Sequence, residues 1–185
     1  RVQTLPNQNV VLVYARDEDG QYSILQNAFL CSTGRATPYG TYYTSEKKVW
    51  GQLFGSKSSN YQYVYGQYVT RIVNNILFHT VPYFTMVKDD LEYEQYDLLG
   101  TAASLGCIRM NVESTKWIYD NCPYGTRIEI CDLDTLPVTR PASPVIDPED
   151  PRRGWDPTDP ECKPKYAVTP SPDTTPDPTP FPGVT

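Results

Sequence analysis

Histidine is almost absent from this 185-residue chain, which contains only His79, and no stretch of 18 or more consecutive apolar residues occurs. A membrane-spanning helix needs about 20 such residues, so membrane contact is expected only through a segment outside this sequence. The sequence begins at Arg1, without an initiator methionine or a signal-peptide pattern, and we therefore expect that a leader or anchor has been trimmed away. With one histidine and no zinc-finger spacing among the cysteines, neither a metal nor a cofactor is predicted.

Basic residues are also scarce. The chain has 16 lysines and arginines against 22 aspartates and glutamates, which gives a formal net charge of -6 and a pI near 4.8. Nucleic-acid phosphates are bound by a basic stripe or patch, and none is visible in the sequence. Nucleic acid is therefore excluded as a partner.

Proline is concentrated at one end: 14 of the 18 prolines fall in the 49 residues from Pro137 onward. This division predicts one folded domain over residues 1–136, large enough to bury a core, and a Pro/Asp/Thr-rich tail over residues 137–185. The stretch 170–182 is expected to be extended and mobile. Trp155 leaves two alternatives for the first half of the tail, which either packs on the body through this ring or is a free linker.

The body is rich in tyrosine, valine, isoleucine and threonine, which favour strands, so a mainly β fold is predicted. Strands are expected at residues 10–14, 22–30, 41–44, 63–70, 72–78 and 126–132, with a long hairpin loop at 51–60. Asn111 is a good N-cap for a helix over residues 112–121, which Pro123 ends. The acidic stretch 89–99 has leucines spaced for one apolar helical face, and it predicts either a short helix on a lid or a solvated surface helix without a role.

Cys107 is the residue with the clearest chemical potential. It lies just before the predicted helix at 112–121, whose amide groups favour a nearby negative charge. An imidazolium or a helix N-terminus lowers a thiol pKa from about 8.5 into the range where the nucleophilic thiolate forms. Any Cys/His mechanism must use His79, which ends a predicted strand. Taken alone, however, a single cysteine in an apolar β domain is more often a packing residue than a nucleophile, and a single histidine is similarly ambiguous.

Five cysteines leave one over if four of them pair. Three pairings are open to the set apart from Cys107, and the same residues are equally compatible with buried free thiols. This set is Cys31, Cys122, Cys131 and Cys162.

Several separated motifs resemble a known family. An early strand is followed by Ser32, Thr33 and Gly34 and then by a Thr-Pro-Tyr-Gly turn at 37–40; a hydrophobic strand ends at His79; and Ser-Leu-Gly-Cys-Ile-Arg follows at 104–109. Over roughly residues 9–132 the chain resembles the L,D-transpeptidase catalytic domain, also called the YkuD family. The resemblance implies a β-sandwich of mixed sheets with one or two short helices.

The sequence departs from the family pattern in two places. Leu105 stands where the family signature has histidine, and 28 residues separate His79 from Cys107 (107 minus 79), more than is usual in the family. Because the extra length falls in the acidic stretch, we interpret it as a lid inserted over the site. The resemblance assigns the role of base to the upstream histidine, so activity is expected, with substrate positioning changed at Leu105.

The resemblance implies Cys107 as the nucleophile and His79 as general base and acid. Backbone amides near the nucleophile would form the oxyanion hole. The implied oxyanion and loop residues are Gly106, Ser104 and Leu105, and the implied substrate-binding or supporting residues are Arg109, Thr80 and Tyr83. Two roles are open to Arg109, namely orienting the loop and contacting a substrate carboxylate.

The implied partners are peptidoglycan stem peptides, as donor and acceptor. Cys107 would attack the carbonyl joining a diamino acid to a terminal D-alanine, and the side-chain amine of a second stem would resolve the thioester as a 3→3 cross-link. Water as acceptor would make the enzyme an L,D-carboxypeptidase. Acids near Asp89 and Glu92 are expected to attract the acceptor amine. Inhibition by carbapenem-type drugs and an extracytoplasmic location, in a bacterial cell wall or secreted, follow from the same resemblance.

Two other functions stay open. One is a non-catalytic peptidoglycan-binding module of the same fold, to which Leu105 points and against which the retained pair of Cys107 and His79 argues. The other is a cysteine peptidase on an unrelated β fold, which would act on free peptides.

Overall fold

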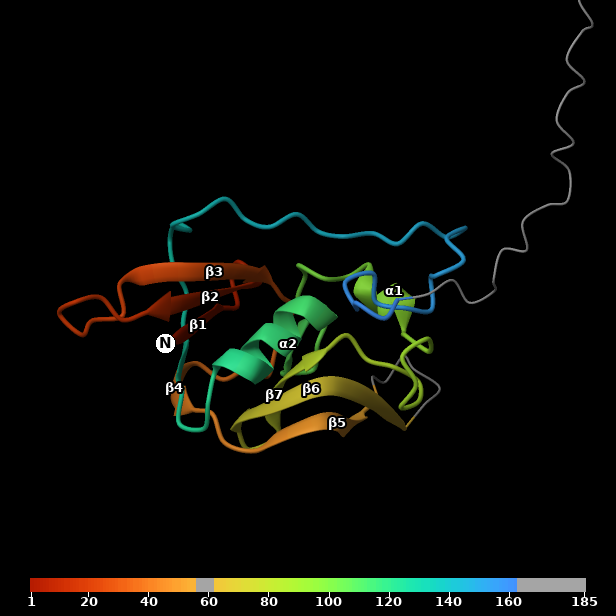
Figure 1. Cartoon of the computed structure of the whole chain (residues 1–185), viewed down its shortest axis with the longest axis horizontal. Coiled ribbons are helices and arrows are strands. Elements are labelled where there is room, and N and C mark those ends of the chain that lie inside the picture. The colour runs from red at the N-terminus through yellow and green to blue at the C-terminus, as the bar shows by residue number, and fades with distance from the viewer. Residues whose placement is uncertain (56–61, 163–185) are drawn as a thin grey trace, which may run out of the picture.

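A computed structural model describes residues 1–55 and 62–162, whose strands form two mixed sheets (Figure 1). The first has the order β3-β2-β1-β9-β4 and consists of β1 (Val2–Leu5), β2 (Val10–Ala15), β3 (Ile24–Leu30), β4 (Gly40–Tyr43) and β9 (Arg127–Ile130). The second has the order β5-β6-β7-β8 and consists of β5 (Lys47–Phe54), β6 (Tyr63–Val73), β7 (Ile76–Thr80) and β8 (Ile108–Met110). The predicted mainly β fold is confirmed.

Each sheet contains one parallel pair, β1 with β9 in the first and β7 with β8 in the second. The main core lies between the sheets and joins residues of both, including Val11, Phe78 and Ile108. Strand β2 is apolar along its length because both of its faces are covered: Val10 and Leu12 pack with Leu5 against residues that follow β9. The parallel pair of β7 and β8 positions the functional site.

Helix α2 (Val112–Asn121) has the predicted bounds and the predicted cap. The side chain of Asn111 accepts a hydrogen bond from the Ser114 amide at 2.9 Å, which satisfies one of the free donors of the first turn. Ile118 of this helix packs into the main core, and Pro123 follows the last turn. None of the helices in the described part of the chain is long and apolar enough to cross a membrane.

The strand boundaries around β5 and β6 differ from expectation. Residues 51–54 belong to β5 although their glycine content predicts a loop, because Gly51 pairs directly with Gly66 across the ladder. Residues 56–60 of the predicted loop lie outside the described residues. β6 continues to Val73, and the turn falls at Asn74, which has the left-handed φ of 48° that asparagine tolerates.

The acidic stretch forms a single short turn of helix, α1 (Tyr93–Tyr96), instead of the predicted helix over 89–99. Its apolar side chains build a second core beside the sheets. The members of this second core are Val81, Tyr83, Leu91, Tyr96, Leu99 and Ile146. Because Ile146 comes from the proline-rich part of the chain, burial here depends on contacts that no local pattern predicts.

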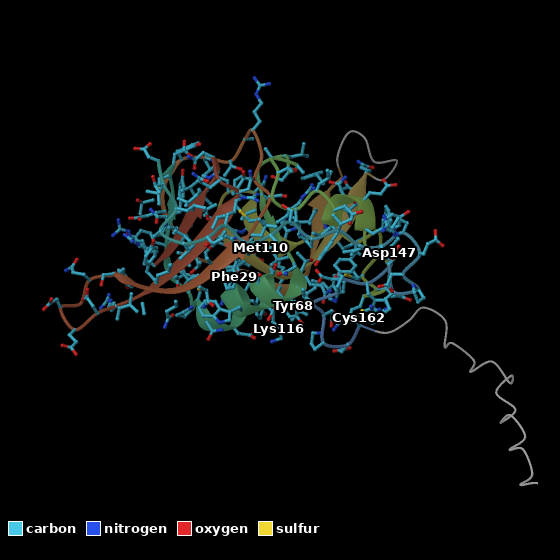
Figure 2. All side chains as sticks on the ribbon, turned by 90° about the horizontal axis from the view of Figure 1, so that it is seen from above. Phe29, Tyr68, Met110, Lys116, Asp147 and Cys162 are labelled. Atoms are coloured by element: carbon cyan, nitrogen blue, oxygen red, sulfur yellow. The ribbon has the colours of Figure 1, made fainter. Side chains whose placement is uncertain are left out.

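Residues 133–162 run along the molecule from the end of β9 to α1 (Figure 1). Figure 2 shows Asp147 and Cys162 on the opposite side of the molecule from the β2–β3 hairpin. The carbonyl of Gly154 accepts a hydrogen bond from the Leu91 amide, and buried Asp156 accepts one from the Val112 amide at 2.8 Å, at the start of α2. Trp155 itself is half-buried. The predicted mobile stretch at 170–182 lies outside the described residues.

Candidate active site

The loop that carries Cys107 is held by its own serine. The hydroxyl of Ser104 donates to the Cys107 carbonyl at 2.6 Å and accepts from the Gly106 amide at 3.0 Å, which closes a tight turn before β8. The Gly106 amide therefore already has a partner in the resting site. Ser104 thus fixes the orientation of one of the backbone amides expected near the oxyanion.

The Ser-Thr-Gly turn at 32–34 and the Thr-Pro-Tyr-Gly turn at 37–40 pack against this loop and support it. The hydroxyl of Thr37 donates to the Gly106 carbonyl at 2.8 Å and accepts from the Gly34 amide at 2.9 Å. Gly34 is required because a Cβ there would lie 2.1 Å from the Ser104 carbonyl oxygen. The Ser-Thr-Gly turn and the Thr-Pro-Tyr-Gly turn thus act together as a seat for the nucleophile loop.

Cys107 lines a cavity and is half-buried. Its thiol donates to the Asn75 carbonyl at 3.3 Å. Burial raises the pKa of this thiol, while the Leu77 amide and the Arg109 charge act in the opposite direction. Burial therefore favours the neutral thiol over the thiolate.

His79 is buried, and its Nδ1 lies 2.6 Å from the Thr80 carbonyl oxygen. Since a carbonyl only accepts, this contact assigns the proton to Nδ1 and leaves Nε2 free to act as base. Burial and the Arg109 charge lower the pKa of His79 to about 3, against the effect of the Thr80 carbonyl. The burial of both groups thus favours a neutral thiol and a neutral imidazole over an ion pair between them.

Strands β7 and β8 bring the two residues to the same cavity. Their parallel register places His79 beside Arg109, two residues after Cys107. Gly66 on β6 makes room for the imidazole, since a Cβ there would lie 3.0 Å from the His79 Cβ. The cavity has a volume of about 300 Å³.

The cavity is mostly apolar with a few polar side chains. Leu105 is 55% exposed and Phe54 70% exposed at its rim, so an apolar surface stands where the family signature would place an imidazole. Its described lining is Gln52, Leu53, Phe54, Val64, Arg71, Asn75, Ile76, Leu77, His79, Pro82, Ser104, Leu105, Gly106, Cys107 and Arg109.

Arg109 supports the loop. Its Nη1 donates to the Gln95 side chain at 2.8 Å and to the Ala103 carbonyl at 3.2 Å, and the residue is only 6% exposed. Burial lowers the pKa of this guanidinium, and the charge of Glu92 partly offsets that effect. The geometry corresponds to the loop-orienting role, one of the two alternatives that the sequence leaves open.

Thr80 and Tyr83 lie behind the cavity wall. Thr80 holds His79 through its carbonyl, and its hydroxyl accepts from the Gln67 amide at 2.9 Å. Tyr83 is fully buried, its ring packs edge-on against Trp50, and its hydroxyl accepts from the Gln67 side chain. It has no exposed surface for a substrate, so only a supporting role is compatible with its position.

The acidic stretch does not cover the site as the sequence predicts. Among the described residues that line the cavity, none comes from 83–103 and none is acidic. Glu92 is 8% exposed, and burial raises its carboxyl pKa. The stretch turns away because its apolar side chains bury in the second core, so its acids do not face an incoming amine from the cavity wall.

The remaining cysteines lie away from the cavity. All five cysteines fall in the described part of the chain and are free thiols. Burial raises the pKa of Cys31 and of Cys122, the latter to about 11, and unlike Cys107 neither thiol shares the cavity with His79. Within residues 1–55 and 62–162, no group of His, Cys, Asp and Glu side chains could hold a metal ion.

Nine of the described lining residues were not singled out from the sequence as site residues, among them Asn75, Leu77 and Arg71. Asn75 and Leu77 act through backbone groups, which leave no signal in residue type. Arg71 is a strand residue distant in sequence from the Cys107 motif, and only the β6–β7 pairing brings it to the cavity.

Comparison with known proteins identifies the family of the chain. The sequence model of the L,D-transpeptidase catalytic domain, YkuD, matches residues 3–130. YciB of Bacillus subtilis, a protein described as a candidate L,D-transpeptidase, is 37% identical over 97 residues, which are 51% of this chain and 46% of YciB.

Solved structures show the same fold. An L,D-transpeptidase from Mycobacterium smegmatis has a TM-score of 0.55 at 16% identity, covering 70% of this chain and 57% of that one. L,D-transpeptidase 3 from Mycobacterium tuberculosis, solved with a faropenem-derived adduct, has a TM-score of 0.51 at 16% identity, covering 71% of this chain and 59% of that one. The chain spans about half the length of these relatives. Its match to the family model over most of the body means that the chain belongs to the L,D-transpeptidase catalytic domain family, YkuD.

Proposed function

We propose that this protein is an L,D-transpeptidase that forms 3→3 peptidoglycan cross-links through a thioester on Cys107. The observation that carries the proposal is the placement of Cys107 and His79 on one cavity, with the free Nε2 of His79 fixed by the contact between Nδ1 and the Thr80 carbonyl. A thiol, an oriented neutral imidazole and a sheltered cavity are the components that acyl transfer needs.

In the first half of the reaction, the donor stem places the carbonyl before its terminal D-alanine at the thiol. Nε2 of His79 takes the thiol proton as sulfur attacks, and the imidazolium then gives that proton to the departing D-alanine amine. A neutral imidazole is the form that this step requires, and the low pKa of His79 keeps it so. The C–N bond breaks and a C–S bond remains.

In the second half, the side-chain amine of another stem attacks the thioester. His79 accepts a proton from this amine, the new C–N bond forms, and Cys107 leaves as the thiol. Water in place of the amine gives an L,D-carboxypeptidase. Because peptidoglycan is assembled outside the cytoplasm, we propose an extracytoplasmic site of action. We also propose that carbapenems acylate Cys107, since they carry a strained β-lactam ring, as faropenem does.

Incubation with a disaccharide tetrapeptide, followed by mass spectrometry of the products, tests the proposal. We expect free D-alanine together with a cross-linked dimer, and loss of both in Cys107→Ala and His79→Ala. Cys162→Ala is the matched control and should keep both products, because Cys162 lies outside the cavity lining. D-alanine without dimer would identify a carboxypeptidase, and neither product from a folded protein would contradict the proposal.

A further inference from the structure

The cavity is cationic although the chain is acidic. The chain carries a formal net charge of -6, but the described residues lining the cavity include two arginines, Arg71 and Arg109, and no aspartate or glutamate. Arg109 is buried and its Nη1 is directed at Gln95 and Ala103. The Arg71 side chain is 33% exposed, so Arg71 is the cation that an entering ligand meets.

Arg71 also lines a groove on the same sheet. This groove of about 270 Å³ adjoins the cavity and shares Gln52, Leu77 and Arg71 with it. Its charged residues are Glu46, Lys48 and Arg71. Most residues that line the groove belong to strands β5, β6 and β7, which lie side by side (Figure 1). We call Lys48, Glu46 and Arg71 the charged triplet.

Within the charged triplet, Glu46 holds the Arg71 side chain in place, and the triplet as a whole keeps a net positive charge. Arg71 donates from Nε and Nη2 to Oε2 of Glu46, at 3.1 and 2.8 Å, and Lys48 lies 2.6 Å from Oε1. Nη1 donates to the Asn74 carbonyl. A guanidinium has five N–H groups, so two have no partner among the described residues. Two positive charges against one leave a formal charge of +1.

The position of this charge relative to the nucleophile is fixed by the backbone. Arg71 pairs directly with Leu77, whose amide faces the Cys107 sulfur. The Arg71 side chain also contacts the Asn74 carbonyl, and Cys107 contacts the carbonyl of the next residue, Asn75. The two side chains therefore contact the carbonyls of adjacent residues just before β7, and both line the same cavity.

We infer that Arg71, supported by Glu46 and Lys48, binds the free carboxylate of the residue that leaves the donor. This inference rests on the proposed function. When the scissile carbonyl lies at the Cys107 sulfur, the terminal carboxylate is one residue away, inside the same cavity that Arg71 lines. A guanidinium that presents paired N–H groups recognises a carboxylate in a charge-assisted, bidentate manner. Arg71 is thus a specificity-determining residue that restricts cleavage to the last peptide bond of the stem.

Removal of the substrate charge tests the inference in the unaltered enzyme. Release of the terminal residue is measured for two disaccharide tetrapeptides, one ending in the free acid and one in the C-terminal amide. We expect kcat/KM to be on the order of tenfold to a hundredfold higher for the acid, as for a hydrogen-bonded charged group. Equal values for the two substrates would overturn the inference.

Arg71→Gln is the matched variant. It should lower kcat/KM for the acid to the level that the same variant shows with the amide, whereas Arg71→Lys should keep part of the preference. Arg127→Gln, which removes an arginine from another surface, should keep all of it. A preference that survives in Arg71→Gln would overturn the inference. Release from neither substrate by the unaltered enzyme would instead contradict the proposed function and, with it, this inference.

Discussion

Gly66→Ala tests whether the position of His79 determines the rate of acylation. A Cβ at residue 66 would lie 3.0 Å from the Cβ of His79, 3.2 Å from its Nδ1 and 3.1 Å from Cδ1 of Leu53. Ordinary contacts begin near 3.4 Å, so the imidazole has to move by a few tenths of an ångström. That movement acts directly on the bond between Nδ1 and the Thr80 carbonyl.

The expected magnitudes separate stability from activity. Overpacking of this kind costs about 1–3 kcal/mol in the free energy of unfolding. A base displaced by part of an ångström loses on the order of tenfold to a hundredfold in rate. Urea unfolding gives the first quantity, and the rate of adduct formation with a carbapenem, followed by intact mass, gives the second.

Gly51→Ala provides the matched control. Gly51 is the direct cross-strand partner of Gly66, and a Cβ there would meet Cγ2 of Val69 at 2.8 Å without touching His79. A similar loss of stability is expected. Its acylation rate should change by less than about twofold, because the imidazole does not move. Equal rates in the two variants would refute the link between the His79 position and catalysis.

Three further predictions concern groups with defined contacts. Because the pKa of His79 is about 3 in the folded state and near 6.5 when unfolded, its contribution to stability falls as pH drops through this window, by up to about 1.4 kcal/mol per pH unit. The free energy of unfolding of His79→Gln, measured with urea, should therefore depend less on pH in this window than that of the unaltered protein. Asp156 has a raised pKa, which changes stability with pH in the opposite direction, but this residue is present in both proteins. Ser104→Ala removes both bonds that close the loop and should slow carbapenem acylation about tenfold or more, a value that stopped-flow fluorescence can check. Asp156→Ala removes the acceptor for the Val112 amide and should lower the free energy of unfolding at pH 7 by about 1–3 kcal/mol, as measured with urea.

The sequence predicts well those features that depend on local chemistry. Asn111 and Pro123 mark the start and end of α2 because capping and helix termination act within a few residues. The Cys107 motif and the single histidine single out two residues that line the same cavity in the structure. The turns near Thr37 are visible as motifs, although their function as the seat of the nucleophile loop becomes evident only from the contact with Gly106.

Features that depend on distant residues are not predictable in the same way. Leu91 and Leu99 suggest a helical face, but they bury against Ile146, which lies in a proline-rich stretch without a periodic pattern. Gly51 predicts a loop, yet it forms strand β5 opposite Gly66. In each case the deciding contact joins residues far apart in the chain, so local propensity yields to tertiary packing.

The central claim, that Cys107 is an acylated nucleophile activated by His79, is tested most directly by intact mass after exposure to a carbapenem. We predict a single adduct on the unaltered protein and on Cys162→Ala, no adduct on Cys107→Ala, and greatly slowed formation on His79→Ala. An adduct of the same size and rate on folded Cys107→Ala, or no adduct on the unaltered protein, would contradict this claim.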